Sequence, residues 1–173
     1  MRTTDPQDEL LPIVDRKDHP IGQITRKEAH LRPDIIHRAI SVLIFDESGQ
    51  LLIQKRSMTK DTCPGFWSES VGGHVGVNEG YQEVAVREVY EELGVQIHQS
   101  HLTKVGKIIT LSEWEQEMTM VFCFSIPSTT PLKPNKEEIS EITYIDKRAL
   151  KKSIITEKWT PSSLQILQAF VLK

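Results

Sequence analysis

The residues best suited to chemistry are three carboxylates in one short acidic stretch. Glu91 follows Glu88 by three positions and Glu92 follows it by four. In a helix these side chains share one side, with neighbouring Cβ atoms about 5–6 Å apart. Because like charges so close repel, they need a counter-charge, and carboxylate oxygens suit Mg²⁺ or Mn²⁺, which bridge to substrate phosphates. The alternative for such a stretch alone is a solvated charged helix.

A helix that presents these carboxylates is predicted over about residues 79–93. Its apolar residues recur at helical spacings, at Val84, Ala85, Val89 and Leu93. Gly94 is a natural C-terminal stop. The glycines that precede the helix indicate a loop, at Gly72, Gly73 and Gly76.

The rest of the chain predicts alternating strands and helices. Strands are expected at 11–14, 21–24, 39–45, 51–55, 105–111, 118–126 and 142–145, several of them joined by hairpin turns. Asp146 is suited to cap a helix over 147–152, and Thr160-Pro161 to begin a last helix. This alternation predicts an α/β fold, with helices on both faces of a mixed sheet.

The composition limits the kind of protein. The 173 residues include 21 Lys and Arg against 24 Asp and Glu, a net charge of −3. No global basic field exists to hold a nucleic acid polymer or an anionic membrane, and no apolar run reaches the length of a membrane span. Cys63 and Cys123 are too few for a disulfide framework. We expect a cytoplasmic single domain over residues 1–173, with an N-terminal hairpin extension at 1–30.

The stretch 73–95 resembles the Nudix box, G-x5-E-x7-R-E-U-x-E-E-x-G-U, where U is aliphatic. The match has no departures and comprises Gly73, Glu79, Arg87, Glu88, Val89, Glu91, Glu92, Gly94 and Val95. The resemblance implies a Nudix fold, an α/β/α sandwich, and hydrolysis of a pyrophosphate bond in a nucleoside-diphosphate-linked or other small diphosphate compound. It also implies a possible homodimer.

The same resemblance implies roles for the box residues. Glu88, Glu91 and Glu92 would bind Mg²⁺ or Mn²⁺, and Glu88 and Glu91 belong to the catalytic group. Gly73, Glu79 and Arg87 would support the site. The general base is either Glu88 or a loop glutamate, Glu137 or Glu138.

A second resemblance, to isopentenyl-diphosphate isomerase, covers most of the chain from about residue 36. Its stretches include His37-Arg38-Ala39-Ile40-Ser41, Pro64-Gly65-Phe66-Trp67 and Gly73-His74. The similarity implies a metal site of three histidines and two glutamates, at His30, His37, His74, Glu115 and Glu117. Imidazole with carboxylate suits Mn²⁺, Zn²⁺ or Mg²⁺. Scattered surface histidines and a solvated acidic turn are the alternative.

Two departures favour hydrolysis over isomerisation, which remains the alternative function. The catalytic cysteine of the isomerase would fall at Gly72, and no tyrosine lies at 108–110; Cys63 is too distant in sequence to be a simple replacement. A non-catalytic sensor of a nucleotide or protein is a third possibility, against which the intact box counts. Lys55 and Arg56 either contact substrate phosphate or flank a strand end.

Overall fold

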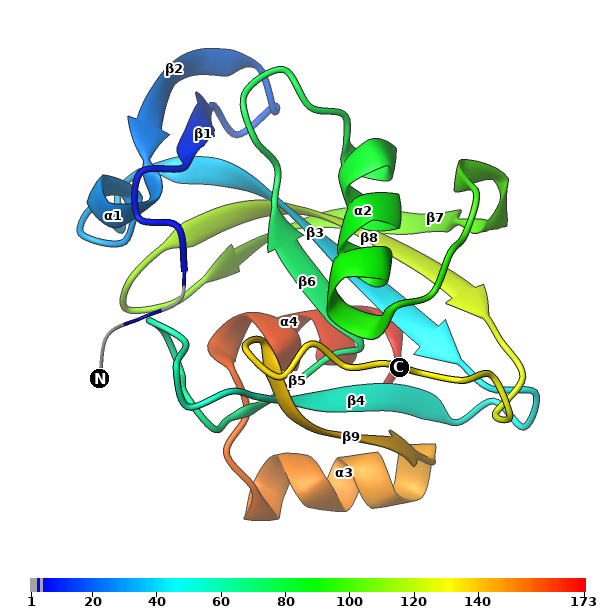
Figure 1. Ribbon diagram of the computed structural model, residues 1–173. Coiled ribbons are helices and arrows are strands. Elements are labelled where there is room, and N and C mark those ends of the chain that lie inside the picture. The colour runs from blue at the N-terminus through cyan, green and yellow to red at the C-terminus, as the bar shows by residue number, and fades with distance from the viewer. Residues whose placement is uncertain (1–2, 4) are drawn as a thin grey trace.

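The computed structural model describes residue 3 and residues 5–173, so positions 1, 2 and 4 of the expected domain lie outside the described residues. One mixed sheet of nine strands forms the centre of the structure (Figure 1). The strands are β1 (Leu10–Val14), β2 (Pro20–Thr25), β3 (Ile36–Phe45), β4 (Leu51–Arg56), β5 (Trp67–Ser68), β6 (Val71–His74), β7 (Thr103–Leu111), β8 (Gln116–Ser125) and β9 (Ile139–Ile145). The helices are α1 (Arg26–Ala29), α2 (Tyr81–Leu93), α3 (Lys147–Thr156) and α4 (Pro161–Phe170), with a 3₁₀ turn at Gln99–His101.

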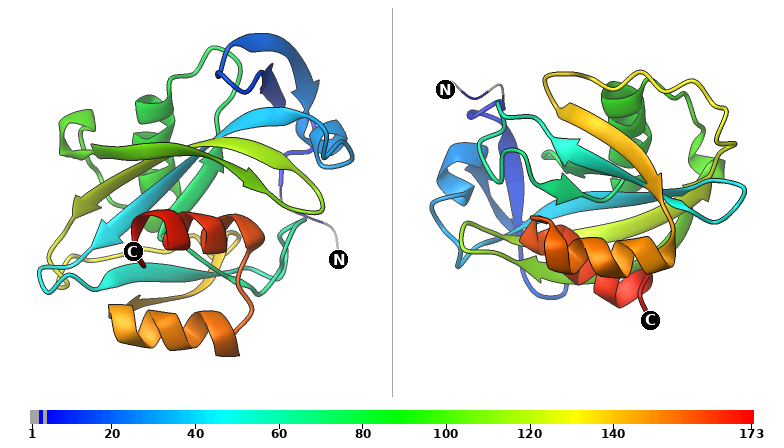
Figure 2. Two further views of the ribbon diagram at one scale, coloured as in Figure 1. Left: turned by 180° about the vertical axis from the view of Figure 1, so that it is seen from behind. Right: turned by 90° about the horizontal axis from the view of Figure 1, so that it is seen from below.

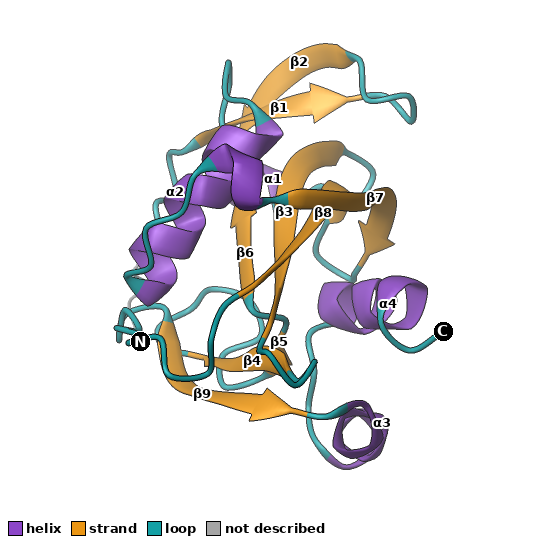
Figure 3. Ribbon diagram, turned by 90° about the vertical axis from the view of Figure 1, so that its right-hand side faces the viewer, coloured by secondary structure: helices purple, strands orange, loops and turns teal. Residues whose placement is uncertain are grey.

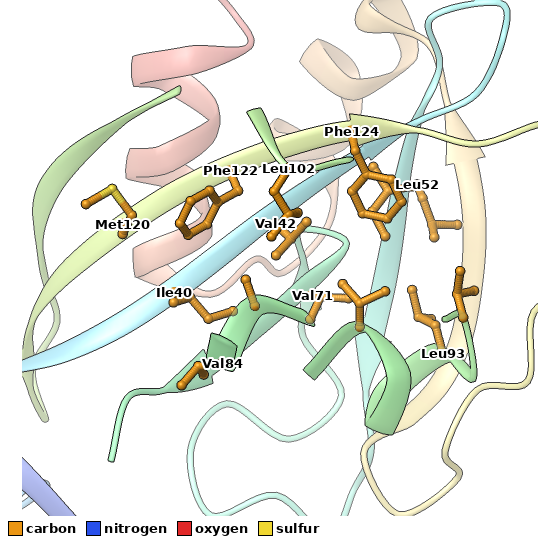
Figure 4. Close-up of a cluster of buried hydrophobic side chains, with 14 of the residues drawn as sticks. Ile40, Val42, Leu52, Val71, Val84, Leu93, Leu102, Met120, Phe122 and Phe124 are labelled. Carbon is orange, nitrogen blue, oxygen red and sulfur yellow. The ribbon is translucent and has the colours of Figure 1, made fainter. Parts of the chain in front are cut away.

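Helices cover both faces of this sheet, as the sequence predicts. Helix α2 lies on one face and α4 on the other, whereas α3 runs beside β9 (Figures 2 and 3). Apolar side chains from α2 and the central strands form one buried cluster, which includes Val42, Val84, Leu93 and Phe122 (Figure 4). A second cluster under α4 includes Val121 and Ile166. The sheet therefore lies between two apolar cores.

Strand β3 organises the sheet because it pairs with several neighbours. It runs parallel to β8 along its whole length and antiparallel to β6 and β1. The β1–β2 hairpin at the N-terminus thus joins the sheet through β1. The turn of this hairpin is fastened by Asp18, which accepts hydrogen bonds from Arg38 at 2.7 Å and from the Tyr81 hydroxyl at 3.0 Å.

Helix α2 follows the predicted bounds closely. It begins after Gly80 and ends at Gly94, whose φ of 69° is left-handed. A residue with a side chain adopts this conformation at a cost, which glycine avoids. The helix places Glu88 beside Gly73 and Glu92 beside Gly72 of β6, whereas Glu91 is exposed.

Some boundaries differ from the prediction. The loop expected at Gly72 and Gly73 is wrong, since both residues lie in β6 and pair with β3. Strands β3, β8 and β9 begin two or three residues earlier than expected, and α3 continues to Thr156. Ladder hydrogen bonds with neighbouring strands override the weak strand preference of glycine and charged residues. None of the described helices is long and apolar enough to span a membrane.

Candidate active site

A polar cavity of about 260 Å³ lies among the N-terminal hairpin, α2, β6, β8 and the start of α4. It brings together side chains that are far apart in the sequence. Of the predicted site residues, its wall contains His30, Arg56, Gly73, His74, Arg87, Glu88, Glu91, Glu92, Glu115, Glu117 and Glu138. The two resemblances therefore point to one place in the fold.

Strand register explains how histidines and glutamates meet here. Parallel pairing of β3 with β8 sets His37 beside Glu117. Antiparallel pairing of β3 with β6 sets His74 beside Ala39, which lies two residues after His37 in β3. His30 follows directly on α1, and Glu115 ends the turn between β7 and β8. The early starts of β3 and β8 thus place site residues within the sheet.

Three imidazoles converge on one carboxylate. Oxygen Oε2 of Glu115 lies 3.0 Å from Nε2 of His30 and 3.4 Å from Nε2 of His37. Nε2 of His74 is 3.9 Å from the same oxygen. One ligand atom from each of these four residues lies within 4.8 Å of the others. Glu117 stands beside the group, with Oε1 3.8 Å from Nε2 of His74.

These converging atoms lack satisfactory hydrogen bonds. Among the buried side-chain atoms of the described residues, Nε2 of His30, both ring nitrogens of His37 and Oε2 of Glu115 have no partner with hydrogen-bond geometry. Buried polar groups are normally satisfied, and these donors fit a cation at their centre. Imidazole and carboxylate are ligands of Zn²⁺ and Mn²⁺, so we name this set, His30, His37, His74 and Glu115, the histidine cluster.

Carboxylates behind the histidine cluster face its outer nitrogens. Nδ1 of His30 lies 3.5 Å from Asp61, and Nδ1 of His74 lies 3.6 Å from Glu9. Such carboxylates commonly orient the histidine ligands of metals. Arg26 also approaches Nδ1 of His74, at 3.1 Å. One protonation state satisfies only one of these two contacts of His74, because Glu9 needs a proton on Nδ1 and Arg26 needs a lone pair there.

Protonation differs across the histidine cluster. Burial lowers the pKa of His37, so its lone pair is available at neutral pH. Burial also lowers the pKa of His30, but Asp61 and Glu115 outweigh this effect and raise it to about 9. Burial raises the pKa of Glu117 to about 7, and the charge of Glu115 adds to the rise.

The box residues form a second group across the cavity. Arg87 donates to Glu88 at 2.9 Å, to Glu91 at 3.1 Å and to Glu79 at 3.3 Å. Arg87 therefore pairs with Glu79 and also holds two of the box carboxylates. Within the described part of the chain, the three box carboxylates do not converge as the histidine cluster does.

Glu92 is the most enclosed of the box carboxylates, with 6% of its surface exposed. It accepts hydrogen bonds from the Gln54 amide at 2.6 Å and from the Gly72 backbone at 3.3 Å. Burial raises its pKa well above the usual value. Burial also raises the pKa of Glu88, to about 7, while Arg87 opposes the rise.

Gly73 is required by the position of Glu88. A Cβ atom added to Gly73 would lie 2.6 Å from Cδ and 2.8 Å from Oε1 of Glu88. Only glycine lets the strand approach this carboxylate so closely. Gly73 therefore supports the site because its missing side chain leaves room for the Glu88 carboxylate.

Of the two predicted loop glutamates and the two predicted basic residues, one of each lines the cavity. Glu138 lines the cavity and accepts a hydrogen bond from Lys60 at 2.6 Å, whereas Glu137 is exposed and outside its wall. Arg56 lines the cavity and donates to the Thr62 carbonyl. Lys55 points elsewhere, with its ammonium 5.5 Å from the centre of the Trp67 ring.

Several residues of the cavity wall were not predicted. Cys63, distant from position 72 in sequence, lines the same cavity from the loop after β4. Glu69 is 5% exposed and lines it from the link between β5 and β6. Glu69 accepts a hydrogen bond from the hydroxyl of Ser163, which lies 94 positions away in the sequence. No local sequence signal marks such a residue, because the fold alone brings its partners near.

Comparison with known proteins gives one consistent result. The model of the NUDIX domain family matches residues 35–170. The chain is 32% identical over 165 residues to the "Uncharacterized Nudix hydrolase PA4841" of Pseudomonas aeruginosa, with 94% of each chain covered. It is 30% identical to an isopentenyl-diphosphate Delta-isomerase of Salmonella paratyphi B, over 94% of this chain and 91% of the relative. The crystal structure of DR0079 from Deinococcus radiodurans is similar, with a TM-score of 0.80, 26% identity and coverage of 94% and 99%.

Proposed function

Since this chain belongs to the NUDIX domain family and is a Nudix hydrolase, we propose that it cleaves a pyrophosphate bond in a small diphosphate compound with the help of a divalent cation. The supporting observation is that the three box carboxylates line one cavity together with His30, His74 and Glu115 of the histidine cluster, in which buried donor atoms lack partners. Both groups favour cations, and it is the bound cations that would draw a polyanion into this acidic cavity.

The proposal assigns ligand roles to two sets of residues. The histidine cluster would hold Mn²⁺ or Zn²⁺, with Glu117 beside it, and Glu88, Glu91 and Glu92 would hold Mg²⁺ or Mn²⁺ with the substrate. A bound cation would offset the diphosphate charge and polarise its phosphorus–oxygen bonds. Arg56 lies in the same wall and would contact phosphate.

Two glutamates are our candidates for the base that takes a proton from the attacking water. Glu88 has a pKa of about 7, raised by burial, which suits a base at neutral pH. Glu138 lines the cavity, but its carboxylate is paired with the Lys60 ammonium at 2.6 Å. We therefore favour Glu88 as the base, with Glu138 as the alternative; Glu137 is too remote from the wall for this role.

Isomerisation of isopentenyl diphosphate is the second candidate, since the histidine cluster matches the set that the isomerase resemblance implies. Isomerisation needs a proton donor and an acceptor on opposite sides of the substrate. Gly72 supplies neither, and Thr110, where a tyrosine was sought, is buried and donates to Glu117 at 3.2 Å. The chain therefore retains groups for cations and diphosphate without this pair of acid and base.

The test is a screen of the purified protein with Mg²⁺ or Mn²⁺ against nucleoside diphosphate sugars, dinucleotides, nucleoside triphosphates and prenyl diphosphates. We expect release of phosphate or phosphomonoester, lost on chelation and reduced by at least about a hundredfold in Glu92→Gln. The matched control is Glu141→Gln, an exposed glutamate outside this cavity. Full turnover by Glu92→Gln, tight binding without turnover, or conversion of isopentenyl diphosphate without released phosphate would each contradict the proposal.

A further inference from the structure

Glu69 is a buried carboxyl group in the cavity wall to which the proposed hydrolysis gives no role. It lies between β5 and β6, and 5% of its surface is exposed. The start of α4, with Thr160 and Pro161, lines the same end of the cavity. A carboxyl group is rarely enclosed in this way unless it is paired or serves a function.

Hydroxyl groups hold one oxygen of this carboxyl. Oε2 of Glu69 accepts hydrogen bonds from Ser68, at 2.9 Å, and from Ser163. Thr160 in turn lies 2.5 Å from the Ser163 hydroxyl. The orientation of Glu69 is therefore fixed through Oε2, and Oε1 is turned the other way.

Oε1 of Glu69 faces Gly72, which separates it from the box carboxylates. A Cβ atom at Gly72 would lie 3.6 Å from Oε1, while the backbone nitrogen of Gly72 donates to Glu92 at 3.3 Å. Gly72 thus contacts Glu92 through its backbone N–H and faces Glu69 where its side chain would be. An organic group that leaves the box on the side of Gly72 would meet this bare backbone and then Oε1 of Glu69.

The chemistry of this end of the cavity distinguishes between organic groups. Because Ser68 and Ser163 hold Oε2, Oε1 can accept hydrogen bonds from hydroxyls of a ligand. An alkyl chain would instead remove water from Oε1 without replacing its hydrogen bond, which is costly. Sites built to bond a hydroxyl reject analogues that lack it.

We propose that Glu69 is a specificity-determining residue, which selects diphosphates whose adjacent organic group carries hydroxyls, as a sugar does, over alkyl diphosphates. The inference rests on the proposed function only in taking the box as the diphosphate site. It places the preference in a single side chain outside the box.

The experiment compares three diphosphates with five-carbon groups: ribose diphosphate, pentyl diphosphate and aminopentyl diphosphate. Binding in the presence of Mn²⁺ is measured by calorimetry, and hydrolysis is measured in parallel. The variants are Glu69→Gln, which keeps shape, and Glu69→Met, which removes both acceptor oxygens. Glu141→Gln is the control, because this exposed residue lies outside the cavity.

We expect the wild-type protein to bind ribose diphosphate about tenfold or more tightly than pentyl diphosphate. Glu69→Gln should reduce this preference by about tenfold through weaker ribose diphosphate binding, and Glu69→Met should also strengthen pentyl diphosphate binding. If Glu69→Met does not fold, the Glu69→Gln result decides.

An unchanged preference in folded Glu69→Gln would overturn the inference, as would tightest wild-type binding of pentyl or aminopentyl diphosphate, or binding of none of the three. Failure of the proposed function gives a different pattern. If none of the compounds is hydrolysed but ribose diphosphate binding depends on Glu69, the specificity role of Glu69 stands. The proposal that this cavity hydrolyses diphosphates is then contradicted.

Discussion

Replacing Gly73 by alanine should impair catalysis much more than folding. The added Cβ atom would lie 2.6 Å from Cδ of Glu88, whereas ordinary contacts begin near 3.4 Å. The carboxylate must therefore retreat by about 0.8 Å, the difference between these distances. Displacements of about 1 Å in a catalytic group can cost about a hundredfold in rate, and we expect this loss in kcat/KM.

Stability should change little, because the clash involves the end of a flexible side chain. Gly73 has no left-handed φ, so alanine fits the backbone. Alanine also lowers the conformational entropy of the unfolded chain, which stabilises the folded protein by about 0.4–1 kcal/mol. This gain offsets the cost of moving Glu88. Urea unfolding without added metal measures this balance. Gly22→Ala is the control, since a Cβ atom there meets Ile13 at an ordinary 3.5 Å.

A double-mutant cycle tests whether Gly73 acts through Glu88. Adding Gly73→Ala to Glu88→Gln should cause little further loss, because both changes remove the same function. Wild-type kcat/KM in Gly73→Ala, or losses that multiply in the double variant, would refute the reasoning.

Three further predictions concern the cation and the hairpin. Mn²⁺ or Zn²⁺ at a hundred times its Kd should stabilise the protein by about 2.7 kcal/mol; calorimetric melting should show this gain lost in His37→Gln and kept in exposed His19→Gln. Asp61→Asn should weaken metal binding by about 10–100-fold in titrations, because this carboxylate orients His30; unchanged affinity would contradict the assigned role. Asp18→Asn should cost about 2 kcal/mol at pH 7 in urea unfolding. Burial raises the pKa of Asp18, but hydrogen bonds from Lys107, Arg38 and Tyr81 outweigh it and lower the pKa, so its contribution is present above the unfolded-state pKa of about 3.9 and disappears as the pH falls through the folded-state value. A cost that persists in acid would contradict this explanation.

The sequence predicted the parts of the fold that depend on local patterns. Helix α2 could be predicted because Val89 and Leu93 recur at helical spacing and Gly94 ends the helix. Hairpin turns and helix caps such as Asp146 are also local signals. Strand β6 could not be predicted, because Gly72 and Gly73 become strand residues only through pairing with β3.

The candidate site divides in the same way. The position of Glu88 beside Glu91 and Glu92 follows from helix geometry, and the family resemblance adds His37 and Glu117. Their meeting depends on parallel pairing between β3 and β8, which no local pattern specifies.

Long-range partners were the part that sequence reasoning missed. Asp61 contacts Arg26 from 35 positions away, and Glu69 contacts Ser163 from 94 positions away. Similarly, the spacing of the box glutamates does not show that Arg87 holds Glu88 and Glu91. Such contacts depend on tertiary packing and are visible only in the folded structure.

The central claim is that water attacks phosphorus in this cavity with the help of a divalent cation. The most direct measurement is mass spectrometry of the products from a nucleoside diphosphate sugar incubated with Mn²⁺ in ¹⁸O-labelled water. We predict cleavage between the two phosphorus atoms, with the label on a phosphate product, and no reaction after chelation or in Glu92→Gln. An intact diphosphate, label on carbon, or undiminished reaction in Glu92→Gln would contradict the account.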